Sequence, residues 1–384
     1  MTAAGLQRAA GGLALLATGA AIGVWSERTQ QLRSTPASTS DEVVTILGAI
    51  GNTPLLEIPS LSKLTGCRIL AKAEFLNPSG SVKDRAAKYL IESAEKSGDL
   101  PPGGTVVEAT GGNTGLGLAL VAAAKGYKAV FTMPAVTSTE KIALMQAFGA
   151  TTHVQPGVPL SDPNHFYHLA KRIIAANPTT HFGPDQFENI ANFQAHYETT
   201  GPEIWRQTTG RLDGFVAASG TGGTIGGISK FLKEKNPAIE VWVVDPEGGA
   251  TAGYINSKRT NSTLQPNGWE MLPKTSGDTI AEGIGLPRAT PNFKQGVMDH
   301  GIIVTNFEIV RMAYHLLRHD GIFVGPSAAL NVVGAVKLAR KLGPGHTVAT
   351  VLCDGGDRYR SKLYNAEWLK TQGLAEAASE PIGL

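Results

Sequence analysis

Residues 214–227 (GFVAASGTGGTIGG) contain an apolar run, a glycine-rich loop and the beginning of a helical pattern. The run over 214–218 has the length and apolar content of a buried strand, and the loop that follows joins it to the helix. Similar apolar runs, with helically spaced apolar residues between them, recur at 105–107, 129–133, 241–244 and 348–352. Strands that alternate with helices form parallel sheets covered on both faces. The sequence therefore predicts an α/β fold with two open, twisted, mostly parallel sheets.

The predicted organisation has two α/β domains between two terminal segments. The chain has 384 residues, and about 150 residues per domain indicates two or three domains. The alternation of strands and helices begins near Val43, so we place an N-terminal domain at 43–190 and a C-terminal domain at 191–372, with a cleft between them. Residues 1–42 are predicted to be a targeting segment and linker, and residues 373–384 a loose tail.

Composition excludes several classes of protein. Charged residues are 17% of the chain and the formal net charge is +2, so we expect no nucleic-acid partner. The two cysteines, Cys67 and Cys353, form no CxxC pair, which excludes a disulfide scaffold and a thiolate zinc site and favours a reducing compartment. Two histidine pairs lack a third ligand candidate, so we expect no metal: His165 with His168, and His315 with His319.

Residues 9–25 (AAGGLALLATGAAIGVW) carry no charge, and arginines lie on both sides of them. As a helix, the 17 residues would reach about 25 Å, a little short of the ~30 Å hydrocarbon core of a membrane. Two alternatives stay open, a membrane anchor and a cleaved targeting peptide. We predict a mitochondrial protein, with an anchor in the outer membrane as the first of these alternatives.

A lysine stands where a helix is expected to begin. Residues 77–85 (NPSGSVKDR) precede a helical pattern, and Ser81 and Asp84 have the spacing of a capping box. Lys83 then lies in the first turn, where the positive end of the helix dipole disfavours an ammonium ion and favours a nucleophilic amine. The alternative is an ordinary cap with a solvated lysine.

Two glycine-rich loops, at 110–117 (TGGNTGLG) and 219–227, each join a strand to a helix. In the second, backbone N–H groups and the hydroxyls of Thr221 and Thr224 are suited to one phosphate. No GxxxxGK[ST] motif is present, and the dinucleotide motif GxGxxG fails at Ile225. A phosphate monoester is therefore favoured, and a degenerate dinucleotide site with Asp245 on a ribose is the alternative.

Two further segments have a functional and a structural interpretation. Ser327 lies in Gly325-Pro326-Ser327 before a long helical pattern, where a simple N-cap is the structural interpretation. Residues 354–358 (DGGDR) follow an apolar strand and are either an acidic catalytic cluster or a solvated turn, and taken alone they favour the turn.

A lysine at a helix start, a loop for one phosphate and a serine at a later helix start together suggest pyridoxal phosphate. The sequence resembles the cysteine synthase branch of the fold-type II pyridoxal phosphate enzymes, which also contains cystathionine β-synthase, and is similar to its fungal mitochondrial members. The resemblance runs from residue 50 to about 363 through SVKDRAA, GGNTGLGLA, DQFENIAN, SGTGGTIGG, EGIG, VGPSAALN and DGGDRY. It implies a tryptophan synthase β-like fold with the cofactor in the cleft between domains.

The resemblance also implies roles for twelve residues. Lys83 would form the internal aldimine, Asn113 would bind the cofactor's ring oxygen, and Ser327 would face its pyridine nitrogen. The phosphate would be held by Gly220, Thr221, Gly222, Gly223 and Thr224. The substrate carboxylate would be held by Thr110, Gly111, Thr114 and Gln186.

The activity implied is a β-replacement that forms L-cysteine from O-acetyl-L-serine and sulfide through an aminoacrylate, in a homodimer that takes small-molecule substrates. A desulfhydrase, a cystathionine β-synthase-like enzyme, a serine deaminase and a non-catalytic partner that binds the cofactor are the alternatives.

The sequence departs from the family's pattern at four places. Gly111 replaces a serine, Ile190 a proline, and Ala328-Ala329 a Ser-Gly or Ser-Ser pair, while residues 254–280 are longer than in the shortest members. We expect the missing hydroxyl at Gly111 to leave room for a bulkier substrate, and Gly111→Ser to favour O-acetylserine.

Overall fold

The computed structural model describes residues 43–382, and the chain from Thr45 onward forms one compact unit. Its larger sheet has six strands, in the order β1 (Leu55–Glu57), β2 (Arg68–Ala73), β13 (Thr347–Leu352), β7 (Gly214–Ala218), β8 (Glu240–Pro246) and β12 (His300–Val304). All neighbours are parallel except β1 and β2. The predicted run at 214–218 is thus a central strand with the expected bounds.

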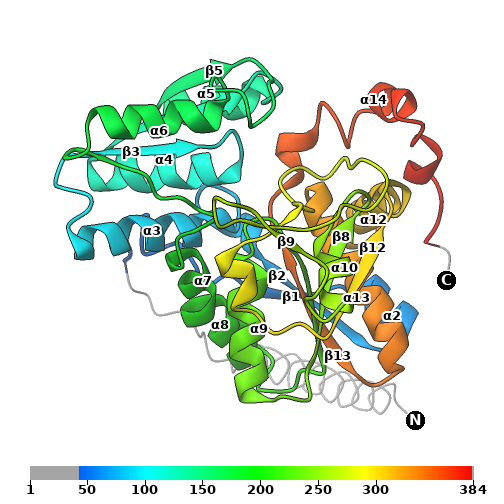
Figure 1. Ribbon diagram of the computed structural model, residues 1–384. Helices are drawn as coiled ribbons and strands as arrows, with labels where there is room; N and C mark the ends of the chain where they lie inside the picture. The colour runs from blue at the N-terminus through cyan, green and yellow to red at the C-terminus, as the bar shows by residue number, and fades with distance from the viewer. Residues whose placement is uncertain (1–42, 383–384) are drawn as a thin grey trace, which may run out of the picture. The chain divides into compact units, whose positions relative to one another are not determined.

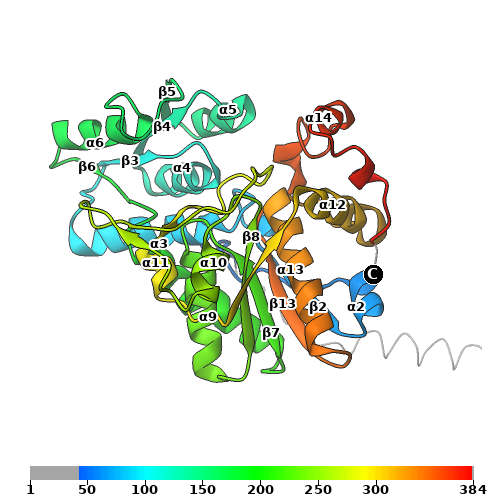
Figure 2. The same ribbon diagram turned by 45° about the vertical axis from the view of Figure 1, so that its right-hand side comes forward.

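Helices cover both faces of this sheet (Figures 1 and 2). On β7, Val216 belongs to one buried cluster, while Phe215 and Ala217 belong to the other, as the two-residue period of a strand requires. The first cluster contains residues of α2 (Pro59–Thr65), α12 (Asn306–Asp320) and α13 (Pro326–Leu342). The second contains residues of α8 (Gly201–Gln207), α9 (Gly223–Lys235) and α10 (Thr251–Asn256).

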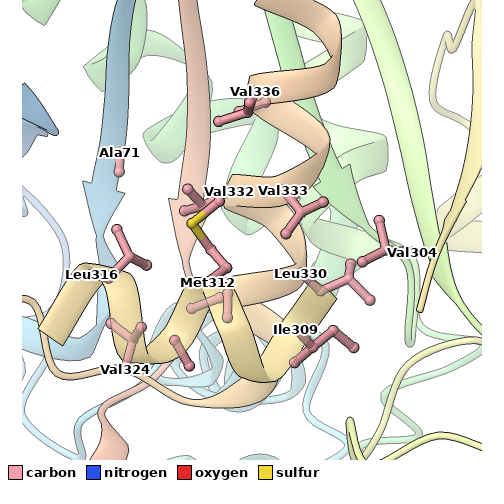
Figure 3. Packing of buried hydrophobic residues seen from close by; sticks show 14 of the residues in the cluster. Ala71, Val304, Ile309, Met312, Leu316, Val324, Leu330, Val332, Val333 and Val336 are labelled. Carbon is pink, nitrogen blue, oxygen red and sulfur yellow. The ribbon is translucent and has the colours of Figure 1, made fainter. Parts of the chain in front are cut away.

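The contact between α12 and α13 shows how the helical spacing is used. Figure 3 shows Met312 of α12 beside Val332 of α13, and Ile309 beside Leu330. These side chains are buried, so the apolar stripe read from the sequence faces the core.

The smaller sheet has four parallel strands, in the order β5 (Thr151–Gln155), β4 (Lys128–Pro134), β3 (Thr105–Ala109) and β6 (His181–Phe182). It packs with α3 (Lys83–Ser97), α4 (Asn113–Lys125), α5 (Thr139–Ala147) and α6 (Phe166–Ala176) (Figure 1). The predicted fold class, two mostly parallel sheets with helices, is confirmed.

The remaining elements are short. Within and beside the longer segment 254–280, β9 (Thr263–Leu264), β10 (Glu270–Met271) and β11 (Arg288–Ala289) form an antiparallel sheet. The short helices are η1 (Glu74–Leu76), α7 (Ala191–Ala195), η2 (His196–Thr200), α11 (Pro291–Lys294), η3 (Gly356–Tyr359), α14 (Ala366–Thr371) and η4 (Glu376–Ala378).

Chain order and sheet membership do not coincide. The strands β1 and β2 come from the first part of the chain but pair into the sheet built by the last part, so the boundary between 43–190 and 191–372 stays a prediction. The predicted loose tail differs from the structure up to residue 382, because Leu374 and Ala377 are buried against the core that contains α12. Residues 9–25 lie outside the described part, and within 43–382 no helix is long and apolar enough to cross a membrane.

Candidate active site

A cavity of about 560 Å³ lies where the carboxyl ends of β3, β4, β7 and β13 meet the first turns of α3, α4, α9 and α13. Carboxyl ends of parallel strands are where α/β proteins bind ligands. Eleven of the twelve predicted site residues line this cavity, and the twelfth, Gly223, is the first residue of α9. The structure therefore brings Lys83, the two glycine-rich loops and Ser327 to one place.

Lys83 is the first residue of α3, but the predicted capping box is wrong. The carboxylate of Asp84 accepts hydrogen bonds from the backbone N–H, at 2.6 Å, and the hydroxyl of Ser79. Burial raises the pKa of Asp84 to about 6. The neighbouring backbone is tied to β13 because the Val82 N–H donates to the carbonyl of Cys353 at 2.8 Å, which fixes Lys83 at the cavity wall.

The start of α9 has the shape and the donors that a phosphate needs. Gly222 is the N-cap residue at φ 88°, and a Cβ there would lie 2.5 Å from the backbone nitrogen of Phe293. Only glycine fits this close approach. The first N–H groups of α9 have no side-chain cap, so they are available to an anion at the edge of the cavity.

Two hydroxyls complete this cradle. Thr221 Oγ1 accepts from Asn192 Nδ2 at 2.8 Å, which leaves its own proton to donate, and Thr224 Oγ1 lies 3.2 Å from His196 Nε2. Burial, followed by the charges of Arg85 and Lys83, holds the pKa of His196 well below its ordinary value. A neutral imidazole, backbone N–H groups and hydroxyls fit the phosphate of pyridoxal phosphate.

Both the nitrogen and the oxygen of the Asn113 side-chain amide, at the start of α4, make hydrogen bonds. Its Nδ2 donates to Asp354 Oδ2 at 2.7 Å, and its Oδ1 accepts from the Arg358 guanidinium. Asp354 also accepts from the Tyr359 hydroxyl at 2.7 Å and is fully buried, so the interpretation of residues 354–358 as a solvated turn is wrong. An acidic residue two positions after a buried strand was the sequence signal for Asp354 as a functional residue.

Ser327 is the second residue of α13 and not its N-cap, which is Gly325. It is buried at the cavity wall beside Cys353. Burial, followed by the charge of Asp354, raises the pKa of the Cys353 thiol to about 11, so this thiol stays protonated at neutral pH. Ser327 thus presents a neutral hydroxyl beside a neutral thiol.

The predicted substrate residues surround the first turn of α4. Thr114 Oγ1 donates to Gln186 Oε1 at 2.5 Å, and the Gln186 backbone N–H donates to Glu108 Oε1 at 3.3 Å. Burial raises the pKa of Glu108 to about 7. The N-cap of α4, Gly112, has no side-chain cap, so the N–H groups of this turn are available to a carboxylate.

The expectation of open space beside Gly111 is wrong. A Cβ on Gly111 would overlap the Thr137 side chain, with Thr137 Oγ1 nearest and Cγ2 at 2.8 Å. Thr137 itself lines the cavity, and the sequence alone did not indicate this contact because 26 residues separate the two positions.

The dinucleotide alternative is wrong as well. Asp245 is fully buried, and its carboxylate accepts from Thr251 Oγ1 and from the Ala252 N–H, both at 2.7 Å. It therefore caps α10. Among residues 43–382 no group of three or more histidine, cysteine, aspartate or glutamate side chains is arranged to hold a metal ion.

Besides Lys83, three charged side chains lie at the cavity wall. Glu282 accepts from Lys141 Nζ of α5 at 2.6 Å and from Lys362 Nζ at 2.5 Å. Burial acts to raise the pKa of Glu282, but the two ammonium groups outweigh it and hold that pKa below its ordinary value. Glu282 is therefore ionised and links α5 to the segment after η3.

Comparisons with known proteins agree with this site. A family model described as pyridoxal-phosphate dependent enzyme matches residues 46–354. A cysteine synthase of Dictyostelium discoideum is 47% identical over 324 residues, which cover 84% of this chain and 85% of that protein. A Saccharomyces cerevisiae protein provisionally named mitochondrial cysteine synthase is 42% identical over 327 residues, 82% of each chain. The crystal structure of the O-acetylserine dependent cystathionine β-synthase of Helicobacter pylori is similar with a TM-score of 0.72 and 34% identity, over 84% of this chain and 99% of that one.

Proposed function

Because the chain belongs to the family of pyridoxal-phosphate dependent enzymes, we propose that it forms L-cysteine from O-acetyl-L-serine and sulfide. The observation that carries this proposal is that one cavity contains Lys83, a phosphate cradle and the uncapped first turn of α4. The cradle suits the cofactor, and the first turn of α4 suits the carboxylate of an amino acid.

In this proposal the chain holds the cofactor at four points. Lys83 Nζ would bind it covalently, residues 220–224 would hold its phosphate, Asn113 would bind its ring oxygen, and Ser327 would face its ring nitrogen. The cofactor supplies an electron sink for bonds to the substrate's Cα. Ser327 offers a neutral hydroxyl, which does not hold a proton on the ring nitrogen as a carboxylate would.

The substrate is oriented by its carboxylate. Thr110, Gly111, Thr114 and Gln186, with the N–H groups at the start of α4, bind the two carboxylate oxygens. Lys83 lines the same cavity, and its Nζ, as a free amine, would accept the α-proton while acetate leaves from Cβ. Sulfide would then bond to Cβ, and Lys83 Nζ would return the proton to Cα.

The test is cysteine formation by the purified, cofactor-loaded protein. O-acetylserine, O-phosphoserine and serine are supplied in turn as donors, with sulfide as the nucleophile. We expect cysteine from O-acetylserine at the highest rate, and no cysteine from any donor would refute the proposal. Homocysteine replaces sulfide in a parallel assay, because the Helicobacter pylori neighbour is a cystathionine β-synthase that depends on O-acetylserine. Faster use of homocysteine than of sulfide would favour that activity.

We also propose a mitochondrial location and a homodimer. The Saccharomyces cerevisiae relative supports the location. Fractionation with carbonate extraction tests it, since an anchored protein stays in the membrane pellet and a cleaved one is released. The homodimer rests on the family resemblance, and light scattering on the purified protein tests it.

A further inference from the structure

We propose that Thr137 replaces the hydroxyl that Gly111 lacks and donates a hydrogen bond to the carboxylate of the amino-acid substrate. This inference rests on the proposed function in one respect, which is that the first turn of α4 binds the carboxylate of an α-amino acid. It makes Thr137 a substrate-binding residue and ties the choice of residue at position 111 to that at position 137.

The topology brings the two residues together. β3 and β4 are adjacent parallel strands, and Ala109 is paired with Thr132. The loops that follow them therefore leave the sheet side by side, with Gly111 in one and Thr137 in the other. The backbone N–H of Thr137 donates to the carbonyl of Pro134 at 3.0 Å, which fixes the turn that carries its side chain.

The positions of the atoms show what Thr137 replaces. Thr137 Oγ1 is the atom nearest to where a Cβ on Gly111 would lie, and a serine hydroxyl would be one bond beyond that Cβ. The Thr137 oxygen thus occupies the volume of a serine side chain at position 111. Gly111 does not have a φ in the left-handed region, so the space taken by Thr137, and not the backbone, excludes a larger residue there.

The charge of the ligand follows from the surroundings of this hydroxyl. It lies in the cavity wall with the uncapped start of α4, where N–H groups and the helix dipole favour an anion. The hydroxyl adds a donor for that anion, and Thr137 Cγ2 lies 2.8 Å from where a Cβ on Gly111 would be. The pair therefore selects substrates with a free α-carboxylate and does not widen the site.

The experiment measures ligand binding to the cofactor-loaded full chain through the cofactor's absorption spectrum. The probes are L-serine and L-serinamide, which lacks the carboxylate. Thr137→Val keeps the shape and removes the hydroxyl, and we expect its Kd for L-serine to rise about 10- to 150-fold, with the Kd for L-serinamide changed less than about twofold. Thr137→Ser should bind L-serine as the wild type does. Thr139→Val, at an exposed position outside the cavity, is the matched control.

Exchange of the two side chains provides a rescue. Gly111→Ser alone should weaken L-serine binding because the new Cβ overlaps Thr137, and adding Thr137→Gly should restore it. An unchanged Kd in Thr137→Val, an equal loss for both probes, or no rescue would overturn the inference. Cysteine formation by the wild type is measured separately, so a protein that makes no cysteine but binds L-serine through Thr137 would refute only the proposed reaction.

Discussion

Replacing Gly222 by alanine tests the phosphate cradle most directly. The new Cβ would lie 2.5 Å from the backbone nitrogen of Phe293 and 2.6 Å from its Cβ, and Phe293 is fully buried. Neither atom is the end of a flexible side chain, so the start of α9 or of α11 must shift. The substitution also places an L-residue at φ 88°.

Two costs add at this position. The left-handed backbone costs an alanine roughly 1–2 kcal/mol, and overpacking costs about 1–3 kcal/mol. We therefore expect Gly222→Ala to lower the free energy of unfolding by roughly 2–5 kcal/mol. A shifted helix start also moves the N–H groups that face the phosphate, and the loss of one hydrogen bond to a charged group weakens cofactor binding by about tenfold or more.

Two other glycines separate these costs. Gly98 has φ 82° with nothing within 4 Å of a new Cβ, so its alanine variant carries the backbone cost alone. Gly253, exposed in α10, has an ordinary φ and open space around a new Cβ. Gly253→Ala should therefore raise the free energy of unfolding by about 0.5–1 kcal/mol. Urea unfolding of the apo forms and titration with pyridoxal phosphate give both quantities. The reasoning would be refuted if Gly222→Ala lowered the free energy of unfolding no more than Gly98→Ala does and left the cofactor affinity unchanged.

Three further predictions concern single residues. Lys83→Ala should lose the covalent cofactor linkage, and a cofactor still attached to the chain after borohydride reduction, seen by mass spectrometry, would contradict the assignment. The pKa of Glu108 is raised in the folded state to about 7 from 4.5, so its contribution to stability falls as pH rises through that interval. Glu108→Gln should therefore gain stability relative to the wild type between pH 5 and pH 8 in urea unfolding, and a constant difference would argue against this. Asp354→Asn removes the charged acceptor of Asn113 and should weaken cofactor binding about fivefold, measured by titration, whereas unchanged affinity would mean that Asn113 is positioned without it.

The strands and helices were predictable because burial imposes a period on the sequence. The alternation of Phe215, Val216 and Ala217 between two cores, and the stripe along α12, are local consequences of strand and helix geometry. The place of β2 was not predictable in this way, because pairing with β13 joins residues almost 280 positions apart. Sequence spacing contains no information on such a register.

In the candidate site, too, local features were predictable from the sequence and long-range contacts were not. Glycine-rich loops between strands and helices identified the cradle, since backbone shape is encoded locally. The hydrogen-bond partners of side chains were missed, as for Asp84, which accepts from Ser79 and forms no capping box, and for Asp354, which accepts from Asn113. A side chain's hydrogen-bond partner depends on tertiary packing, so a motif identifies a residue's location better than its partner.

The ion pairs that Glu282 makes with Lys141 and Lys362 affect how anions enter and leave the cavity. Two ammonium groups and one carboxylate leave one net positive charge at the cavity wall. Hydrosulfide and acetate, the anions that enter and leave in the proposed reaction, are attracted by such a charge, and the attraction is screened as ionic strength rises. Added salt also weakens the contacts that hold α5 against Glu282. Salt is therefore expected to slow the arrival of the anionic nucleophile and at the same time to weaken the ion pairs of Glu282 at the cavity wall.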